Sequence, residues 1–206
     1  IASDGNIYAS YYGNGVCRFD SNGQKTARYT VEKSPLNNNY VMDILEHEGK
    51  LWMGTDGGGI TKMDLQTGEF SFLTHITGDK TSLPVNSITK LYKDYNDNLW
   101  VGSVRGGVFS ISNSYIRTFQ DVVLNNTNGL TERAISSIYE EKDGRLWIGT
   151  DGGGINLYNP ETKKFTHYPT TYGDKVVSIA GLSEDELLVS LYTKGIFKFN
   201  KKTGSY

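Results

Sequence analysis

One ten-residue motif recurs along the chain at nearly constant intervals. It reads LWMGTDGGGI at residues 51–60, LWVGSVRGGV at 99–108 and LWIGTDGGGI at 146–155, so its tryptophans lie 48 and 47 residues apart. A fixed period of this length is the sequence signature of a repeat protein. Weaker copies end at Gly15-Val16 and Gly195-Ile196. We therefore predict a single segment of five units, at residues 1–33, 34–80, 81–128, 129–172 and 173–206.

Each unit is predicted to be a meander of four short strands. In the fourth unit, turn-forming residues separate four short runs, at residues 135–139, 146–150, 155–158 and 165–168. The first turn contains Asp143-Gly144, a strong hairpin signal because glycine adopts the positive φ of a tight turn. No stretch shows a sustained helical apolar period, so helices should be nearly absent.

The second strand of each unit indicates how the units pack. In residues 146–148 the apolar side chains are consecutive, a pattern typical of a strand buried on both faces. Four-stranded antiparallel sheets of this kind, repeated in series, predict an all-β fold, a β-propeller with one sheet per blade. A solenoid is the competing architecture, but its repeats usually have one or two strands and a shorter period.

The outer units are shorter than the inner ones. The first unit lacks a first strand, and the last stops at Tyr206, where its fourth strand should begin. We expect the chain to be a partial arc of a larger propeller of about seven blades. The alternative is that the two partial units complete one another.

Aligning the units separates constant positions from variable ones. A glycine followed by a β-branched residue occurs in every unit, at Gly15, Gly59, Gly107, Gly154 and Gly195. This pattern predicts a backbone position that tolerates only glycine, followed by a core-facing side chain. We interpret the motif tryptophans as packing residues between blades and not as a ligand-stacking surface.

The variable positions lie two and three residues before that glycine, in the loop between the second and third strands. They are Tyr12-Gly13, Asp56-Gly57, Val104-Arg105, Asp151-Gly152 and Tyr192-Thr193. In a propeller this loop opens on the same face as the connections between blades. A constant scaffold with one varied loop face is typical of the binding surface of a repeat protein.

Arg105 is the sharpest candidate on this loop face. It places a charge where other units have glycine or threonine. Its planar guanidinium group suits the carboxylates or sulfates of acidic glycans. The alternative is a surface salt bridge to a neighbouring loop.

Four more loop residues are ligand-binding candidates. Tyr12 and Tyr192 could offer flat amphipathic surfaces to a sugar ring, although packing within the loop explains them equally simply. Asp56 and Asp151 are turn residues in the first place, because aspartate readily hydrogen-bonds the backbone of a tight turn. Contact with a ligand is a second interpretation of both.

The sequence offers little support for catalysis or metal binding. Of the three histidines only His75, in a connection between units, lies on the loop face, and it completes the set of ligand-binding candidates. No Ser-His-Asp or Cys-His arrangement follows from the spacing. Residues 94–98 resemble a calcium loop faintly, but Leu99 and Arg105 replace the required glycine and glutamate. We predict no catalytic residue, no metal site and no cofactor.

Composition limits the partners of the chain. Its hydrophobic content is 37% and its formal net charge is −2, which gives no electrostatic reason to expect a nucleic acid. No apolar run approaches the length of a membrane span. The single Cys17 excludes an internal disulfide, which is compatible with the cytoplasm and equally with the bacterial periplasm.

The motif resembles a known repeat. Residues 146–160, LWIGTDGGGINLYNP, followed by FTHY at 165–168, are similar to the two-component-regulator propeller repeat, and residues 51–73 are similar to it as well. Residues 75–88 resemble the connection between blades in that family. The first and fifth units depart from the pattern because they lack the Trp-x-Gly-Thr core, and Val104-Arg105 departs from it where Asp-Gly is expected.

The resemblance implies the periplasmic sensor region of a hybrid two-component system of Bacteroidetes. The parent protein would combine two such propellers with a small β-sandwich, a membrane helix, a histidine kinase and a DNA-binding response regulator. It would act as a homodimer, bind an oligosaccharide through its propellers and control polysaccharide-utilisation genes. This segment would neither bind nucleic acid nor catalyse a reaction.

Two other functions stay open. One is a stand-alone propeller lectin or protein-interaction scaffold. The other is a lyase similar to the streptogramin-inactivating lyases, a propeller family that uses histidine and magnesium. Paired histidines at the loop positions of the blades, which that chemistry needs, are missing here.

Overall fold

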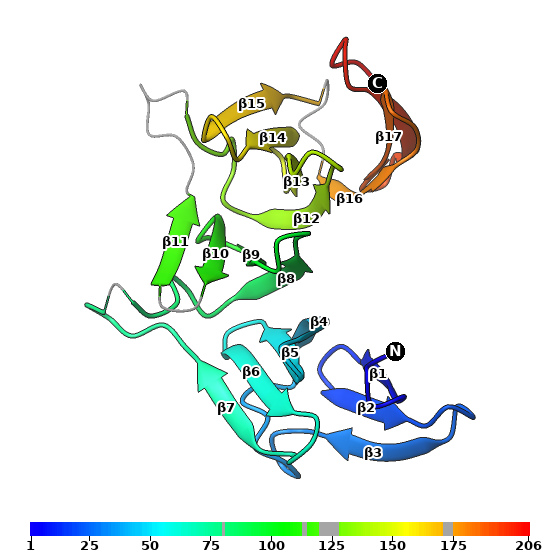
Figure 1. Ribbon diagram of the computed structural model, residues 1–206, viewed down its shortest axis with the longest axis vertical. Coiled ribbons are helices and arrows are strands. Elements are labelled where there is room, and N and C mark those ends of the chain that lie inside the picture. Colours follow the sequence, from blue (N-terminus) through cyan, green and yellow to red (C-terminus); the bar gives the residue numbers. More distant parts are fainter. Residues whose placement is uncertain (80, 113–114, 120–127, 171–174) are drawn as a thin grey trace. The chain divides into compact units, whose positions relative to one another are not determined.

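The computed structural model describes residues 1–79, 81–112, 115–119, 128–170 and 175–206. These residues form eighteen strands and no helix (Figure 1). The strands make five sheets, numbered here in chain order, and each sheet consists of strands consecutive in the chain. The described residues divide into two compact bodies. The N-terminal body contains Ile1–Lys93, Asn98–Val101 and Ser110–Ile116, and the C-terminal body contains Asp94–Asp97, Gly102–Phe109 and Arg117–Tyr206.

The first two sheets belong to the N-terminal body. The first sheet contains β1 (Ile7–Ser10), β2 (Val16–Phe19) and β3 (Lys25–Tyr29). The second contains β4 (Val41–His47), β5 (Lys50–Thr55), β6 (Gly59–Asp64) and β7 (Phe70–Leu73). The third sheet, which is divided between the bodies, contains β8 (Ile88–Lys93), β9 (Leu99–Ser103), β10 (Val108–Ser112) and β11 (Tyr115–Phe119).

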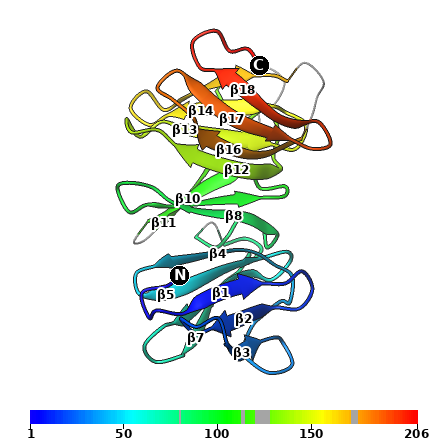
Figure 2. The ribbon, with the colours of Figure 1, turned by 90° about the vertical axis from the view of Figure 1, so that its right-hand side faces the viewer.

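The last two sheets belong to the C-terminal body. The fourth contains β12 (Ile135–Glu140), β13 (Leu146–Thr150), β14 (Ile155–Asn159) and β15 (Lys164–Tyr168). The fifth contains β16 (Val176–Gly181), β17 (Glu186–Leu191) and β18 (Gly195–Asn200), which form one three-stranded layer in Figure 2. The predicted four-stranded meanders are thus confirmed in the second, third and fourth sheets, and the first and fifth have three described strands.

The second strand of the complete sheets is buried, as predicted. All residues of β9 and β13 are buried, and in β5 only Lys50 is partly exposed. Trp147 is 1% exposed and belongs to a core cluster that includes Val176 and Phe199 of the fifth sheet. The interpretation of the motif tryptophans as packing residues between sheets is therefore confirmed for Trp147, and Trp52 and Trp100 are buried as well.

The glycine of the Trp-x-Gly-Thr core allows neighbouring sheets to approach. A Cβ atom on Gly54 would lie 2.7 Å from Cγ2 of Ile88, at the start of β8. A Cβ atom on Gly149 would lie 2.5 Å from Cγ1 of Val176, at the start of β16. Both distances are shorter than real Cβ contacts, so a side chain here would push the next sheet away.

A side chain on one first strand bonds the first strand of the next sheet. Asp43 Oδ2 accepts a hydrogen bond from the backbone N–H of Leu91 at 2.8 Å. At the equivalent position, Ser137 Oγ accepts the N–H of Ile179 at 2.9 Å. Each bond satisfies a strand N–H that has no partner within its own sheet, and it sets the distance between first strands.

A hydroxyl group closes the hairpin after the second strand. Thr55 Oγ1 donates to the carbonyl oxygen of Gly59 at 2.9 Å and accepts the N–H of Gly58 at 3.1 Å. Thr150 and Ser103 bond the matching carbonyl oxygens in the fourth and third sheets, at 2.9 and 2.8 Å. The threonine of the motif is therefore a structural residue.

Replacing Thr55 with valine should destabilise the protein by about 1–3 kcal/mol, because the buried groups that it bonds would lose their partner. Urea denaturation would measure the change in the free energy of unfolding. Thr55→Ser is the control, because serine keeps the hydroxyl and occupies this position in the third sheet. Equal losses in both variants would contradict the proposed role of the hydroxyl.

Candidate ligand-binding face

The hairpins between the second and third strands are held by backbone hydrogen bonds. In the second sheet, the N–H of Asp56 donates to the carbonyl oxygen of Tyr40, just before β4, at 2.9 Å. The N–H of Gly59 donates to the carbonyl oxygen of Asn86, just before β8, at 2.8 Å. The hairpin is thereby bonded to the connections on both sides, so its side chains can vary without moving its backbone.

The C-terminal body repeats this arrangement. The N–H groups of Asp151 and Tyr192 each donate at 2.9 Å to a carbonyl oxygen just before their own first strand, in Ala134 and Lys175 respectively. These bonds confirm, within each body, the prediction that the hairpins lie beside the connections between sheets.

In the N-terminal body, Tyr12 pairs with a residue that the sequence analysis missed. Tyr12 is 74% exposed and Tyr40 is 44% exposed, and their rings meet edge to face with centroids 5.0 Å apart. A Cβ atom on Gly13 would lie 3.3 Å from the Tyr40 ring, so this glycine leaves room for the ring beside the hairpin. The sequence signal that could have identified Tyr40 is its position directly before a first strand, in a connection that belongs to the predicted loop face.

A hollow of about 440 Å³ lies on the first sheet, lined by residues of β2, β3 and the hairpin that carries Tyr12. Tyr11, Asn14 and Arg28 are among its lining residues. The Arg28 guanidinium group donates to Oδ1 of Asn14 at 2.8 Å, which holds both side chains at the hollow. An aromatic ring, an amide and a guanidinium group thus line this hollow.

Hydrogen bonds connect Asp56 and His75 to the same part of the loop face as Tyr40. Asp56 bonds Tyr40 directly, and His75 is connected to the Asp56 hairpin through Asn86. The Asp56 side chain is exposed and accepts no hydrogen bond from a described residue. The N–H of His75 donates to Oδ1 of Asn86 at 2.7 Å, and its Nδ1 bonds the carbonyl oxygen of Leu83 at 2.7 Å. A carbonyl oxygen only accepts, so Nδ1 carries the proton and His75 first of all stabilises its loop.

The candidate residues of the C-terminal body are also connected to one another by hydrogen bonds and an ion pair. Asp151 and Lys175 form an ion pair at 2.9 Å, and the N–H of Tyr192 bonds the backbone of Lys175. Tyr192 is 63% exposed. The hairpin that carries Arg105 is bonded to the connection just before β12, because the N–H of Gly107 donates to the carbonyl oxygen of Arg133 at 3.1 Å.

The side chains of Arg105 and Asp151 differ in whether they are available to contact a ligand. Arg105 is exposed and forms no ion pair with any described residue, so the predicted alternative of a surface salt bridge is not observed there. Asp151 is paired with Lys175, which favours its structural interpretation. Within the described ranges, no group of three or more His, Cys, Asp or Glu side chains is placed to hold a metal ion.

The repeat itself matches a family model. The two component regulator propeller model matches residues 35–57, 82–105 and 129–152, which include the three clear copies of the second strand. The chain carries two-component regulator propeller repeats. No curated protein matches the sequence significantly.

Solved structures with similar folds include two bacterial extracellular domains. One is the extracellular domain assigned to a hybrid two component system of B. thetaiotaomicron, with 22% identity and a TM-score of 0.75, covering 97% of this chain and 26% of that chain. Another is the extracellular domain assigned to a one component system of the same organism, with 19% identity and a TM-score of 0.77, covering 98% of this chain and 26% of that chain. At these identities the likeness establishes the fold, a β-propeller of which this chain forms part.

A propeller enzyme is similar as well. Virginiamycin B lyase from Staphylococcus aureus has 17% identity and a TM-score of 0.66, with coverage of 97% of this chain and 68% of that chain. This chain therefore spans about a quarter of the two sensor domains and two thirds of the lyase. None of the described segments of this chain forms a helix suited to crossing a bilayer.

Proposed function

We propose that this chain is a ligand-sensing segment of an extracytoplasmic propeller in a hybrid two-component system. Its ligand would be an oligosaccharide, and its signal would control genes for polysaccharide use. The regulator repeats and the likeness to two extracellular domains from B. thetaiotaomicron support this assignment. The remaining blades, the kinase and a second copy of the receptor would be its partners.

The observation that carries the proposal is the exposed ring pair of Tyr12 and Tyr40. The rings lie at 73° to one another, with Tyr12 on the hairpin between β1 and β2 and Tyr40 on the connection just before β4. The N–H of Gly15 donates to the carbonyl oxygen of Asn39 at 2.9 Å, which holds this hairpin against that connection. Such rings offer apolar faces together with hydroxyl groups, which suits the mixed surface of a sugar. Because the pair is already in place, little conformational entropy is lost on binding.

The signal would be a shift of population between two arrangements of the receptor. A ligand achieves this only if it binds one arrangement more tightly than the other. We propose no catalytic role for the segment, because His75, the one histidine among the candidates, is engaged with the backbone of Leu83. Magnesium-dependent turnover of a streptogramin would contradict this.

Calorimetric titration of neutral and acidic oligosaccharides into the complete extracellular region tests the proposal. Tyr12→Ala should weaken binding of every active glycan by about 10-fold, from loss of an aromatic contact worth about 1.4 kcal/mol. Arg105→Ala should weaken only glycans that carry a carboxylate or sulfate, because it removes a charge-assisted hydrogen bond.

Tyr95→Ala provides the matched control. Tyr95 is 70% exposed but lies in the turn between β8 and β9, at the opposite end of β9 from the hairpin that carries Arg105. Its removal should leave binding unchanged. Absence of heat with every glycan, or equal losses in Tyr12→Ala and Tyr95→Ala, would overturn the proposal and leave a protein-interaction scaffold as the function.

A further inference from the structure

A second cavity lies at the other end of the strands, between the fourth and fifth sheets. It has a volume of about 500 Å³ and is lined by the turn between β12 and β13 and the turn between β16 and β17. This volume is within the range of small-ligand sites. It involves none of the candidate residues of the loop face.

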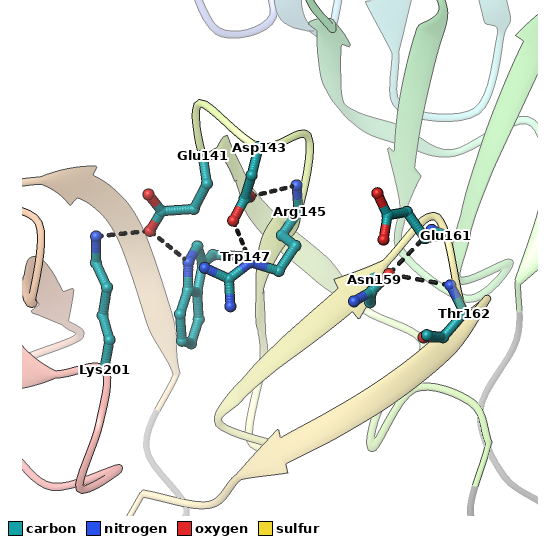
Figure 3. Close-up of polar contacts among 8 residues, drawn as sticks. All are labelled: Glu141, Asp143, Arg145, Trp147, Asn159, Glu161, Thr162 and Lys201. Atoms are coloured by element: carbon teal, nitrogen blue, oxygen red, sulfur yellow. Dashed lines mark hydrogen bonds and ion pairs between the residues drawn. The ribbon is translucent and has the colours of Figure 1, made fainter.

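A buried ionic network holds the two turns together (Figure 3). Glu141 Oε1 accepts a hydrogen bond from the indole Nε1 of Trp147 at 2.9 Å and pairs with Nζ of Lys201 at 2.6 Å. Lys201 also donates to the carbonyl oxygen of Ser183 at 3.0 Å. Because both charges are mostly buried and have partners, this network forms a rigid wall of the cavity.

Tyr139 reaches across the cavity toward the fifth sheet. A Cβ atom on Gly181 would lie 2.1 Å from the Tyr139 hydroxyl, so glycine is what allows the hydroxyl to occupy this place. The hydroxyl bonds no described residue. Burial and the nearby Glu141 charge raise the pKa of Tyr139, so the group stays protonated and can both donate and accept.

Two charged side chains add unused polar groups to the lining. Arg145 uses Nε to bond Asp143 Oδ2 at 2.7 Å, which orients its guanidinium group (Figure 3). Its terminal nitrogens bond no described residue. Glu184, from the opposite turn, lines the cavity with a carboxylate that likewise has no described partner.

We propose that this cavity binds a neutral polyol, such as a small sugar. The cavity is lined by hydrogen-bond donors of Arg145, an acceptor of Glu184 and the Tyr139 hydroxyl, which both donates and accepts. Only a ligand whose own groups both donate and accept satisfies all three. Glu141 and Asp143 are neutralised by Lys201 and Arg145, and the remaining charges of Glu184 and Lys142 are opposite, so the lining offers no net attraction for an anion or a cation. The Tyr139 ring supplies the flat apolar surface.

The equivalent turn of the second sheet lacks this chemistry. There His47 takes the place of Glu141 and bonds the matching Trp52 through its backbone oxygen, and Lys50 is paired with Asp64 at 2.7 Å. The donors and acceptors of the cavity are therefore not shared with the second sheet, although the two sheets have the same repeat scaffold.

Nitrogen-15 NMR of the 206-residue chain tests the proposal, with cellobiose and trehalose as neutral probes and glucuronate and glucosamine as charged probes. The neutral sugars should shift the Arg145 Nε–H and Gly181 N–H resonances with a Kd of about 1 mM. Glu184→Ala and Tyr139→Phe should each weaken this binding by about 10-fold, the effect of losing one hydrogen bond to a polar ligand.

Glu161→Ala is the matched control. Glu161 is an exposed carboxylate in the turn between β14 and β15 of the fourth sheet, apart from the Glu141 network (Figure 3), and its loss should change nothing. Resonances that stay unmoved with both neutral sugars, tighter binding of a charged probe, or an equal effect of Glu161→Ala would each overturn the proposal. Tyr12→Ala should leave this binding intact, so failure here and failure of the loop-face proposal are distinguishable.

Discussion

Gly59→Ala is expected to lower the free energy of unfolding by about 3 kcal/mol. Gly59 has a φ of 77°, where an alanine costs about 1–2 kcal/mol. Its Cβ would also lie 2.3 Å from the carbonyl oxygen of Leu73, at the end of β7. Because backbone and not a flexible side chain is in the way, we add about 1–3 kcal/mol for displacing the strand.

Gly195→Ala separates these two contributions. Gly195 occupies the same repeat position at a φ of 97°, but a Cβ atom there would meet no heavy atom within 4 Å. Only the conformational cost of about 1–2 kcal/mol should remain. Urea denaturation of both variants measures the difference. If Gly195→Ala destabilised the protein as much as Gly59→Ala, the fourth strand would not be the reason for the glycine.

Trp147→Ala is expected to destabilise the protein by about 3–5 kcal/mol, the usual range for deleting a buried aromatic side chain. Trp147 is 1% exposed, and its ring centroid lies 5.4 Å from that of Tyr168 and 5.6 Å from that of Phe199. The substitution would also remove the indole donor to Glu141. The fourth and fifth sheets should therefore lose much of their shared core.

Leu188→Ala is the comparison for this prediction. Leu188 holds the tryptophan position in the fifth sheet but is only half-buried, so its truncation should cost about 1 kcal/mol. Guanidinium denaturation followed by circular dichroism measures both variants. A loss below about 1 kcal/mol in Trp147→Ala would show that the motif tryptophan is not a packing residue.

The sequence predicted some residues of the candidate face and missed others that depend on contacts between sheets. Tyr12, Asp56 and Tyr192 were found because a repeat alignment exposes positions that vary against a constant background. Tyr40 was missed because its role depends on a ring from another sheet, 28 residues away in the chain. The pairing of Asp151 with Lys175 was missed for the same reason.

The sequence by itself determined the repeat length, the four-stranded meanders, the strand-only secondary structure of the described residues and the glycine after each second strand. These features follow from residue order within one unit, through turn chemistry, strand burial and the φ angles open to glycine. Only the tertiary structure decided which side chains of adjacent sheets meet: Asp43 with Leu91, Ser137 with Ile179, Glu141 with Lys201 and Tyr139 with Gly181. Such contacts join residues about 40 or more positions apart and depend on how far one sheet stands from the next, a quantity that no local pattern encodes.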